Sequence, residues 1–240
     1  MDLELQKIVN NYLKDFENKK NFDFVVKNSI PVVWFGDIEA YQKSPKRIVT
    51  IGVNPSNKEF PTKDKPRFDC KANNADALYN TLNNYFKDND TSNPYTGWFN
   101  NLERCLNLID TSFGGKMNAT NFTNTAIHID EHTSIATSKI WRKLKEKQIQ
   151  EINQQELFQD LLNYLNPDVI LMSRNHDIFM SSLHIVNPVQ IFYEHRKIEV
   201  YQENNRIMVY GRNSQGTPFS KDYITDKMFN DAFSEVRNLM

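Results

Sequence analysis

The chain of 240 residues carries a formal net charge of −1, with 39% hydrophobic and 25% charged residues, a composition typical of a folded globular protein. This charge excludes a global attraction to nucleic acid or to an anionic membrane, so a nucleic-acid site would have to be a local patch. Only two cysteines occur, which excludes a four-cysteine zinc or iron–sulfur site, and we expect neither a metal nor another cofactor.

The first twenty residues and the lack of a long apolar run predict a cytoplasmic protein. The amino-terminal stretch is charged throughout and has no apolar region of the kind that a secretory signal contains. No run approaches 18 apolar residues, so we expect no membrane association. Two isolated cysteines fit a reducing compartment. The sequence does not indicate an oligomeric state.

Hydrophobic periodicity predicts helices and strands that alternate along the chain. Helices are expected over residues 3–16, 75–86, 97–109, 138–149, 153–165 and 175–183, and in a last segment that contains Met228, Phe229, Phe233, Val236 and Leu239. Strands are expected over residues 47–53, 120–130, 167–173, 197–203 and 205–211, and a short β-type run covers residues 30–36. Asp76 is the expected cap of the second helix, and Glu156 is the expected capping-box acid of a helix that begins near Asn153.

This alternation predicts an α/β fold, a three-layer α/β/α sandwich around a mainly parallel central sheet. The strand over residues 47–53 is continuously apolar, which is typical of a central strand covered on both faces. No linker, repeat or low-complexity segment interrupts the chain. We therefore expect one domain over residues 1–240, with residues 1–29 as a helical extension at its amino terminus.

Amides and hydroxyls follow the predicted strands at the edge where parallel α/β sheets bind ligands. These residues are Asn54, Pro55 and Ser56 after the first strand, Asn124, His128 and Asp130 in the second, the Ser173–His176 stretch after the third, and the Gly211–Ser214 stretch after the last. The dinucleotide, P-loop and hydrolase-elbow motifs are missing from the sequence. A carboxamide offers a donor and an acceptor together, which matches the edge of a nucleobase.

Aromatic and basic side chains accompany the first of these segments. Phe60 and Phe68 offer stacking faces for a flat ligand, and Lys58 and Arg67 lie between and beside them as phosphate contacts, which Arg212 could join.

Simpler interpretations stand beside these. Asn-Pro is most often a turn, and His128 or either phenylalanine is more often buried core. The basic run "WRKLKEKQ" is typical of a solvated helix face. His176 and the acids Asp130 and Glu131 do not have the spacing of a metal site.

The stretch "IVTIGVNPSNKEF", followed by "KPRF", resembles the first motif of the uracil-DNA glycosylase superfamily, in the form of its mismatch-specific branch. The segment "NTAIHID" is similar to the strand that supplies a base-reading asparagine in some branches, and "PDVILMSRN" resembles a later buried strand. The segment "YGRNSQGTPFS" stands where the family has its second motif, although the usual histidine and proline are missing and Gly211, Arg212, Asn213 and Ser214 stand there instead.

The resemblance implies a DNA glycosylase-like protein that binds a flipped uracil or related base and hydrolyses its N-glycosidic bond. Asn54 would position the attacking water. An amide cannot take a proton from that water, so His128 or Asp130 would have to compensate for the missing general base. Base-binding residues would be Pro55, Ser56, Phe60, Phe68 and Asn124, and DNA-binding residues would be Lys58, Arg67, Arg212, Asn213 and Ser214. The alternative is a non-catalytic protein of the same fold that binds a free nucleobase, a nucleotide or a nucleic acid.

Overall fold

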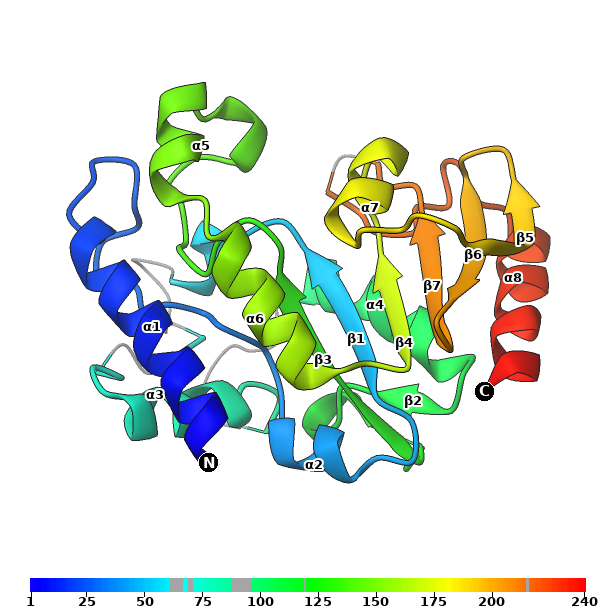
Figure 1. Cartoon of the computed structure of the whole chain (residues 1–240), viewed down its shortest axis with the longest axis horizontal. Helices are drawn as coiled ribbons and strands as arrows, with labels where there is room; N and C mark the ends of the chain where they lie inside the picture. The colour runs from blue at the N-terminus through cyan, green and yellow to red at the C-terminus, as the bar shows by residue number, and fades with distance from the viewer. Residues whose placement is uncertain (61–66, 69–70, 88–95, 119, 215) are drawn as a thin grey trace. The chain divides into compact units, whose positions relative to one another are not determined.

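Eight α-helices and seven strands follow one another along the part of the chain that the computed structural model describes, residues 1–60, 67–68, 71–87, 96–118, 120–214 and 216–240 (Figure 1). The helices are α1 (Leu3–Lys19), α2 (Ile38–Lys43), α3 (Ala75–Asn83), α4 (Thr96–Asn107), α5 (Glu146–Ile152), α6 (Gln155–Leu165), α7 (His176–Ser182) and α8 (Asp226–Leu239). The strands are β1 (Ile48–Gly52), β2 (Thr111–Ser112), β3 (Asn124–Asp130), β4 (Val169–Met172), β5 (Val189–Glu194), β6 (Ile198–Glu203) and β7 (Arg206–Gly211). Short 3-10 helices are η1 (Asn57–Glu59), η2 (Gly115–Met117) and η3 (Trp141–Lys143). Within the described residues, none of the helices has the length and apolar character needed to cross a lipid bilayer.

The strands form one mixed sheet in the order β2-β3-β1-β4-β7-β6-β5. The pairs β2/β3, β1/β4 and β4/β7 are parallel, which confirms the prediction of a mainly parallel sheet, and β1, β4 and β7 point the same way in Figure 1. Every residue of β1 and β4 is buried, as their continuous apolar sequences predict. The strand order reverses between β1 and β4, so their carboxyl ends mark the topological switch point of the sheet.

An antiparallel extension, made of β5 and β6, continues the sheet beyond β7. The β6–β7 turn is built on Asn204 and Asn205, both with positive φ (52° and 63°), a conformation that asparagine tolerates and that two-residue hairpins require. The last strand, β5, follows Pro188 and contains a register shift between Gln190 and Phe192.

The chain divides into two compact units, each assembled from three segments. Unit 1 comprises Met1–Ile38, Val53–Tyr95 and His128–Asn166, and unit 2 comprises Glu39–Gly52, Thr96–Ile127 and Pro167–Met240. The strand β3 contributes its first four residues to unit 2 and its last three to unit 1. A single domain over residues 1–240 stays a prediction.

The core of unit 1 includes the predicted amino-terminal helix. α1 buries Leu5, Ile8, Val9, Tyr12 and Phe16, and packs against α3 and α6. A separate apolar cluster is formed by Phe16, Phe24, Val25, Ile135, Leu144 and Ile152, with Phe22, Trp141 and Ile149 packed against it. Residues 1–29 are therefore an integral part of unit 1.

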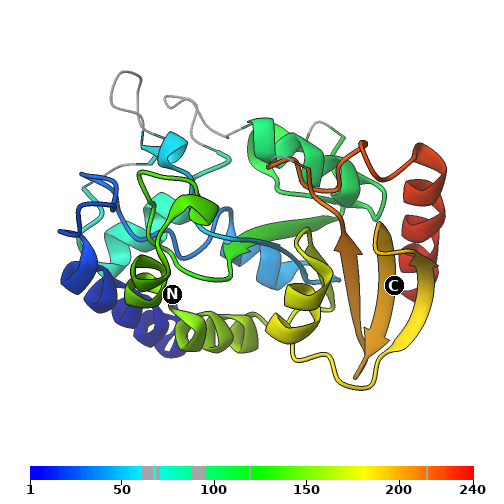
Figure 2. The same ribbon diagram turned by 90° about the horizontal axis from the view of Figure 1, so that it is seen from above.

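In unit 2, helices pack on the strands. α8 contacts β5 and β6, beside which it lies in Figure 2, and α4 contacts β2. Phe219 is fully buried and reaches the backbone at the end of β7. A Cβ atom on Gly211 would lie 2.1 Å from its ring. Glycine is therefore required where β7 ends, because no side chain fits there.

Three sequence-based predictions of helix position were wrong. The segment 138–149 is not one helix. Instead, η3 covers Trp141–Lys143, and α5 starts only at Glu146. The backbone is extended at Leu144 (ψ 148°) and Lys145 (ψ 151°), which separates η3 from α5. Asn74, not Asp76, caps α3, because its Oδ1 accepts from the amide of Ala77 at 2.9 Å.

The third concerns the start of α6, which begins at Gln155 without the expected capping box. Asn153 instead ends α5. The side chain of Gln154 is engaged elsewhere, because its Oε1 accepts from the Ser134 amide at 2.6 Å and from the Thr133 hydroxyl at 3.0 Å. The side chain of Gln154, the residue that precedes α6, therefore makes tertiary hydrogen bonds and does not cap the helix.

Candidate functional site

The loop that leaves β1 fixes the amide of Asn54. Its Nδ2 atom donates to the Pro55 carbonyl at 3.0 Å and to the Thr137 hydroxyl at 3.1 Å. The amide of His132 donates to the Val53 carbonyl at 3.0 Å and ties the loop to the segment after β3. Asn54 is half-buried. With both N–H groups directed at the protein, the Oδ1 atom is the part of this amide that can accept from a water or a base.

The next residues form a single tight turn. Ser56 caps η1, because its hydroxyl accepts from the Lys58 amide at 3.1 Å. Pro55 is buried, Ser56 is half-buried and Lys58 is exposed. The Nε atom of Arg67 donates to the Lys58 carbonyl at 3.1 Å, which brings two predicted phosphate contacts together.

A buried carboxyl group, missed by sequence reasoning, lies at the centre of this loop. Glu59 is 2% exposed, and its Oε2 atom accepts from the Tyr85 hydroxyl at 2.8 Å and lies 3.7 Å from the Arg67 Nε. Burial raises the pKa of Glu59 to about 8, although the Tyr85 hydrogen bond and the Arg67 charge lower it. Carboxyls perturbed in this way concentrate at functional sites, but a charged residue in a polar stretch gives no sequence signal of its burial.

The two predicted stacking rings lie together in an aromatic cluster of unit 1. Phe60 and Phe68 stack with centroids 5.7 Å apart, and Phe68 stacks on Tyr85 at 4.8 Å. Phe35 packs against Phe68 at 5.6 Å and against His128 at 5.4 Å. All these side chains are buried, so in this state the rings form a closed core beside the loop.

His128 lies inside this core. It is 2% exposed, and its Nε2 is 3.7 Å from Asp130 Oδ1. The backbones of His128 and Phe35 form an isolated antiparallel bridge, so the β-type run over residues 30–36 lies beside β3 without becoming a strand. The structure thus links His128 through Phe35 to the ring of Phe68.

Asn124 takes a structural position in unit 2. It is the first residue of β3, and therefore stands at the opposite end of the strand from Asp130. Its Oδ1 accepts from the Lys46 amide at 3.0 Å, and its Nδ2 donates to the Asp110 carbonyl at 3.1 Å. Its amide thus holds three chain segments together, and its base-reading role stays a prediction from the resemblance.

The loop after β7 carries the remaining predicted DNA contacts. The guanidinium of exposed Arg212 lies 3.9 Å over the Tyr223 ring, and the Arg212 amide donates to the Lys197 carbonyl at 2.7 Å. Ser214 forms a short bridge with Thr217, and Asn213 is half-buried. Arg212 and Ser214 are thus held by contacts within unit 2.

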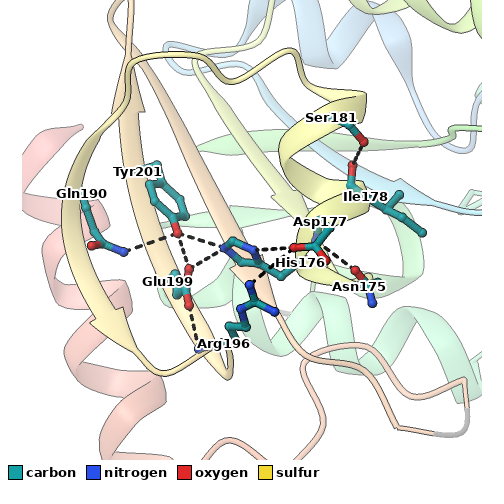
Figure 3. Close-up of polar contacts among 9 residues, drawn as sticks. All are labelled: Asn175, His176, Asp177, Ile178, Ser181, Gln190, Arg196, Glu199 and Tyr201. Carbon is teal, nitrogen blue, oxygen red and sulfur yellow. Dashed lines mark hydrogen bonds and ion pairs between the residues drawn. The ribbon is translucent and has the colours of Figure 1, made fainter.

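A second polar cluster, which sequence reasoning did not predict, surrounds His176 at the start of α7 (Figure 3). The His176 Nε2 lies 2.9 Å from Glu199 Oε2 and 3.1 Å from the Tyr201 hydroxyl. The Tyr201 hydroxyl itself donates to Glu199, and the Arg196 amide donates to the other carboxylate oxygen at 2.6 Å. Burial and the hydrogen bond from Tyr201 to Glu199 raise the pKa of Tyr201.

The cluster is explained by the hydrogen bonds that one buried carboxyl group requires. Glu199 is 0% exposed, and a carboxyl group without solvent requires several donors. His176 and Tyr201 meet that need and join α7 to β6. The Nδ1 atom of His176 lies 3.6 Å from Asp177, too far for a hydrogen bond. We interpret the cluster as a structural hydrogen-bond network that connects α7 to β6. Only the alternation of Glu199 and Tyr201 along β6 could have indicated it from sequence.

A surface hollow of about 580 Å³ lies at the other edge of unit 2. It is lined by His184, Val186, Asn187, Val189, Gln202, Glu203, Asn204 and Asn205. These residues surround the β6–β7 turn, which is remote from the carboxyl ends of β4 and β7. None of the predicted site residues lines this hollow.

Comparison with models of known protein families and with curated proteins found no match.

Proposed function

We propose that this chain is a DNA glycosylase-like protein, which binds a flipped base in unit 1 and hydrolyses its N-glycosidic bond. The observation that carries the proposal is the fixed amide of Asn54, held by Thr137 and Pro55 at the exit of the central strand. An acceptor held rigidly in this way orients a water for attack on the glycosidic carbon. It cannot remove the proton from that water, so positioning and leaving-group stabilisation would supply most of the rate.

The aromatic cluster beside the loop supports the binding of a flat ligand. Phe60 and Phe68 already stack on one another. A flipped base would enter by separating these two rings, so that its own ring replaces one of the two stacking partners. Extrusion of the base from the duplex costs a few kcal/mol, and aromatic stacking returns a similar amount.

The test is release of a base from oligonucleotides that carry uracil or another damaged base in single- and double-stranded form. We expect the wild-type chain to generate abasic sites on at least one substrate, and Asn54→Ala to slow release roughly 100-fold, because the water loses its position. Asn57→Ala is the matched control, since Asn57 is an exposed amide in the same loop. Equal rates for the two variants would contradict the role of Asn54.

A specific observation favours the alternative, a protein that binds a nucleobase, nucleotide or nucleic acid without cleaving it. The side chain of His128, the proposed catalytic partner, is 3% exposed and packed between Phe35 and Asp130. A group in this position cannot exchange protons with solvent unless the core opens. In the same assay, tight binding of the base-containing strand with no abasic product on any substrate would select this alternative.

A further inference from the structure

The most concentrated positive charge in the chain lies in a short segment of unit 1, which we name the basic segment, Lys139–Lys147. Its five basic residues are Lys139, Arg142, Lys143, Lys145 and Lys147, all exposed, and its one acid is Glu146. A local net charge of +4 in nine residues contrasts with −1 for the whole chain. The segment is therefore a discrete electrostatic feature.

The core of unit 1 holds this segment in a fixed orientation. Leu144 is buried in the apolar cluster with Phe16 and Ile152, and Trp141 packs against that cluster. The ring of Trp141 also stacks on His132, with centroids 4.7 Å apart and planes 7° apart. Leu144 and Trp141 thus face the core, whereas the basic side chains and Ile140, which is 53% exposed, lie on the outer side.

One threonine connects the basic segment to the loop of Asn54. Thr137 is 2% exposed. Its hydroxyl accepts from Asn54 Nδ2 at 3.1 Å and donates to the Lys139 carbonyl at 2.7 Å. The start of the basic segment thus lies within two hydrogen bonds of the amide that we assign to the base site.

A row of exposed cations beside a base site fits the phosphodiester backbone of a nucleic-acid strand, since phosphates dominate such contacts. An anionic membrane is also attracted by basic residues, but stable association with lipid requires an apolar face as well. Here Leu144, Trp141 and Ile149 belong to the packed cluster of unit 1, and Ile140 is the one exposed apolar side chain of the segment, too little for an apolar face. A free base or nucleotide would not need so extended a charge.

We propose that the basic segment binds the backbone phosphates of a nucleic-acid strand that flank the base held near Asn54. The position of the base rests on the proposed function, whereas binding of the phosphates does not. The partner is then a polymer rather than a free nucleobase or nucleotide.

The experiment measures binding of a fluorescent 20-nucleotide single-stranded DNA that contains one uracil, by anisotropy over a series of salt concentrations. One variant replaces Arg142, Lys143, Lys145 and Lys147 with glutamine. The control replaces Lys7, Lys14, Lys20 and Lys27, exposed lysines of the same unit, and so removes the same charge. Circular dichroism and the melting temperature verify that both variants are folded.

We expect the basic-segment variant to bind at least 10-fold more weakly at low salt, and the control to stay within 2-fold of wild type. Each phosphate contact adds about 0.7 to the slope of log K against log salt for single strands, so the loss of four contacts flattens the slope by up to about 3. Equal weakening in both variants would overturn the proposal, because charge alone would then explain binding. An unchanged affinity of the basic-segment variant would also overturn it.

Three further comparisons distinguish this proposal from preference for RNA, from membrane binding and from the glycosylase activity. Single-stranded RNA of the same length shows which nucleic acid is preferred, and binding of either supports the proposal. Vesicles with 30% phosphatidylserine that bind through the segment, while the oligonucleotides do not, would overturn it in favour of a membrane. Loss of strand binding in the basic-segment variant, with no base release by wild type, would keep this proposal and reject the glycosylase activity.

Discussion

At the scale of single residues, Glu59 is the group with the clearest expected response to pH. Its pKa is about 8 in the folded chain, against an ordinary value of 4.5, mainly because burial disfavours the charged form. Between these two values the folded state binds one more proton than the unfolded state. Stability therefore falls as the pH rises through this window, and it loses on the order of 4–5 kcal/mol by pH 8–9.

Glu59→Gln tests this expectation, because glutamine resembles the protonated acid and its oxygen still accepts from Tyr85. We expect the variant to match wild type near pH 5 and to be more stable near pH 8.5, as measured by urea unfolding at both values. Asp76→Asn, a change in the first turn of α3, is the control for a general charge effect. Parallel stability profiles for wild type and Glu59→Gln would show that Glu59 does not titrate in this range.

The position of a residue could be predicted where the local sequence determines it, but its hydrogen-bond partners could not. The place of Asn54 at a strand exit was predictable, because the apolar run before it defines β1. The partners of Asn54, Glu59 and Asn124 were not, since Thr137, Tyr85 and Lys46 lie 83, 26 and 78 residues away in the chain. Tertiary contacts, rather than propensity, give these side chains their chemistry.

At the scale of elements, the end of β7 depends on close packing between a glycine and a ring. Gly211→Ala would place a Cβ atom 2.1 Å from Phe219, whose ring is fully buried. We expect a loss of about 1–3 kcal/mol, because overpacking forces either the ring or the strand to move. The free energy of unfolding from chemical denaturation measures this loss.

A double-mutant cycle identifies the cause. Phe219→Leu shortens the opposing side chain, so its combination with Gly211→Ala should cost less than the sum of the two single changes. Strict additivity would mean that the alanine acts through the backbone rather than through the ring.

Elements with continuous apolar sequences were predicted well, and those shaped by their surroundings were not. The strands β1, β4, β6 and β7 appear where the sequence indicates them. β2 has two residues, too few for any periodicity, and β5 is half exposed with no clear alternation, so both were missed. The helix expected over residues 138–149 is interrupted by extended backbone at Leu144 and Lys145, which the apolar spacing of the segment does not indicate.

At the scale of the whole molecule, the two units are interleaved along the chain. The chain passes between them five times, and β3 belongs to both. Melting of either unit would therefore release the ends of segments that the other unit needs. We expect a single cooperative unfolding transition rather than two.

The natural tryptophans can report on each unit separately. Trp34 and Trp141 belong to unit 1, and Trp98 belongs to unit 2. In Trp98→Phe, fluorescence follows unit 1 alone, and in the double variant Trp34→Phe/Trp141→Phe it follows unit 2 alone. Within each variant, the fluorescence midpoint in urea should coincide with the midpoint from circular dichroism. Separate midpoints would show that the units unfold independently.

The register shift in β5 has a consequence for how molecules of this protein behave at high concentration. β5 ends the strand order of the sheet and exposes Val189 and Tyr193. Regular edge strands invite the addition of strands from other molecules and so start fibrous aggregates. Ile191, which the pairing with β6 passes over, interrupts that regularity, and Pro188 removes a backbone donor just before the strand. The irregular edge strand β5 thus disfavours strand pairing between molecules at high protein concentration.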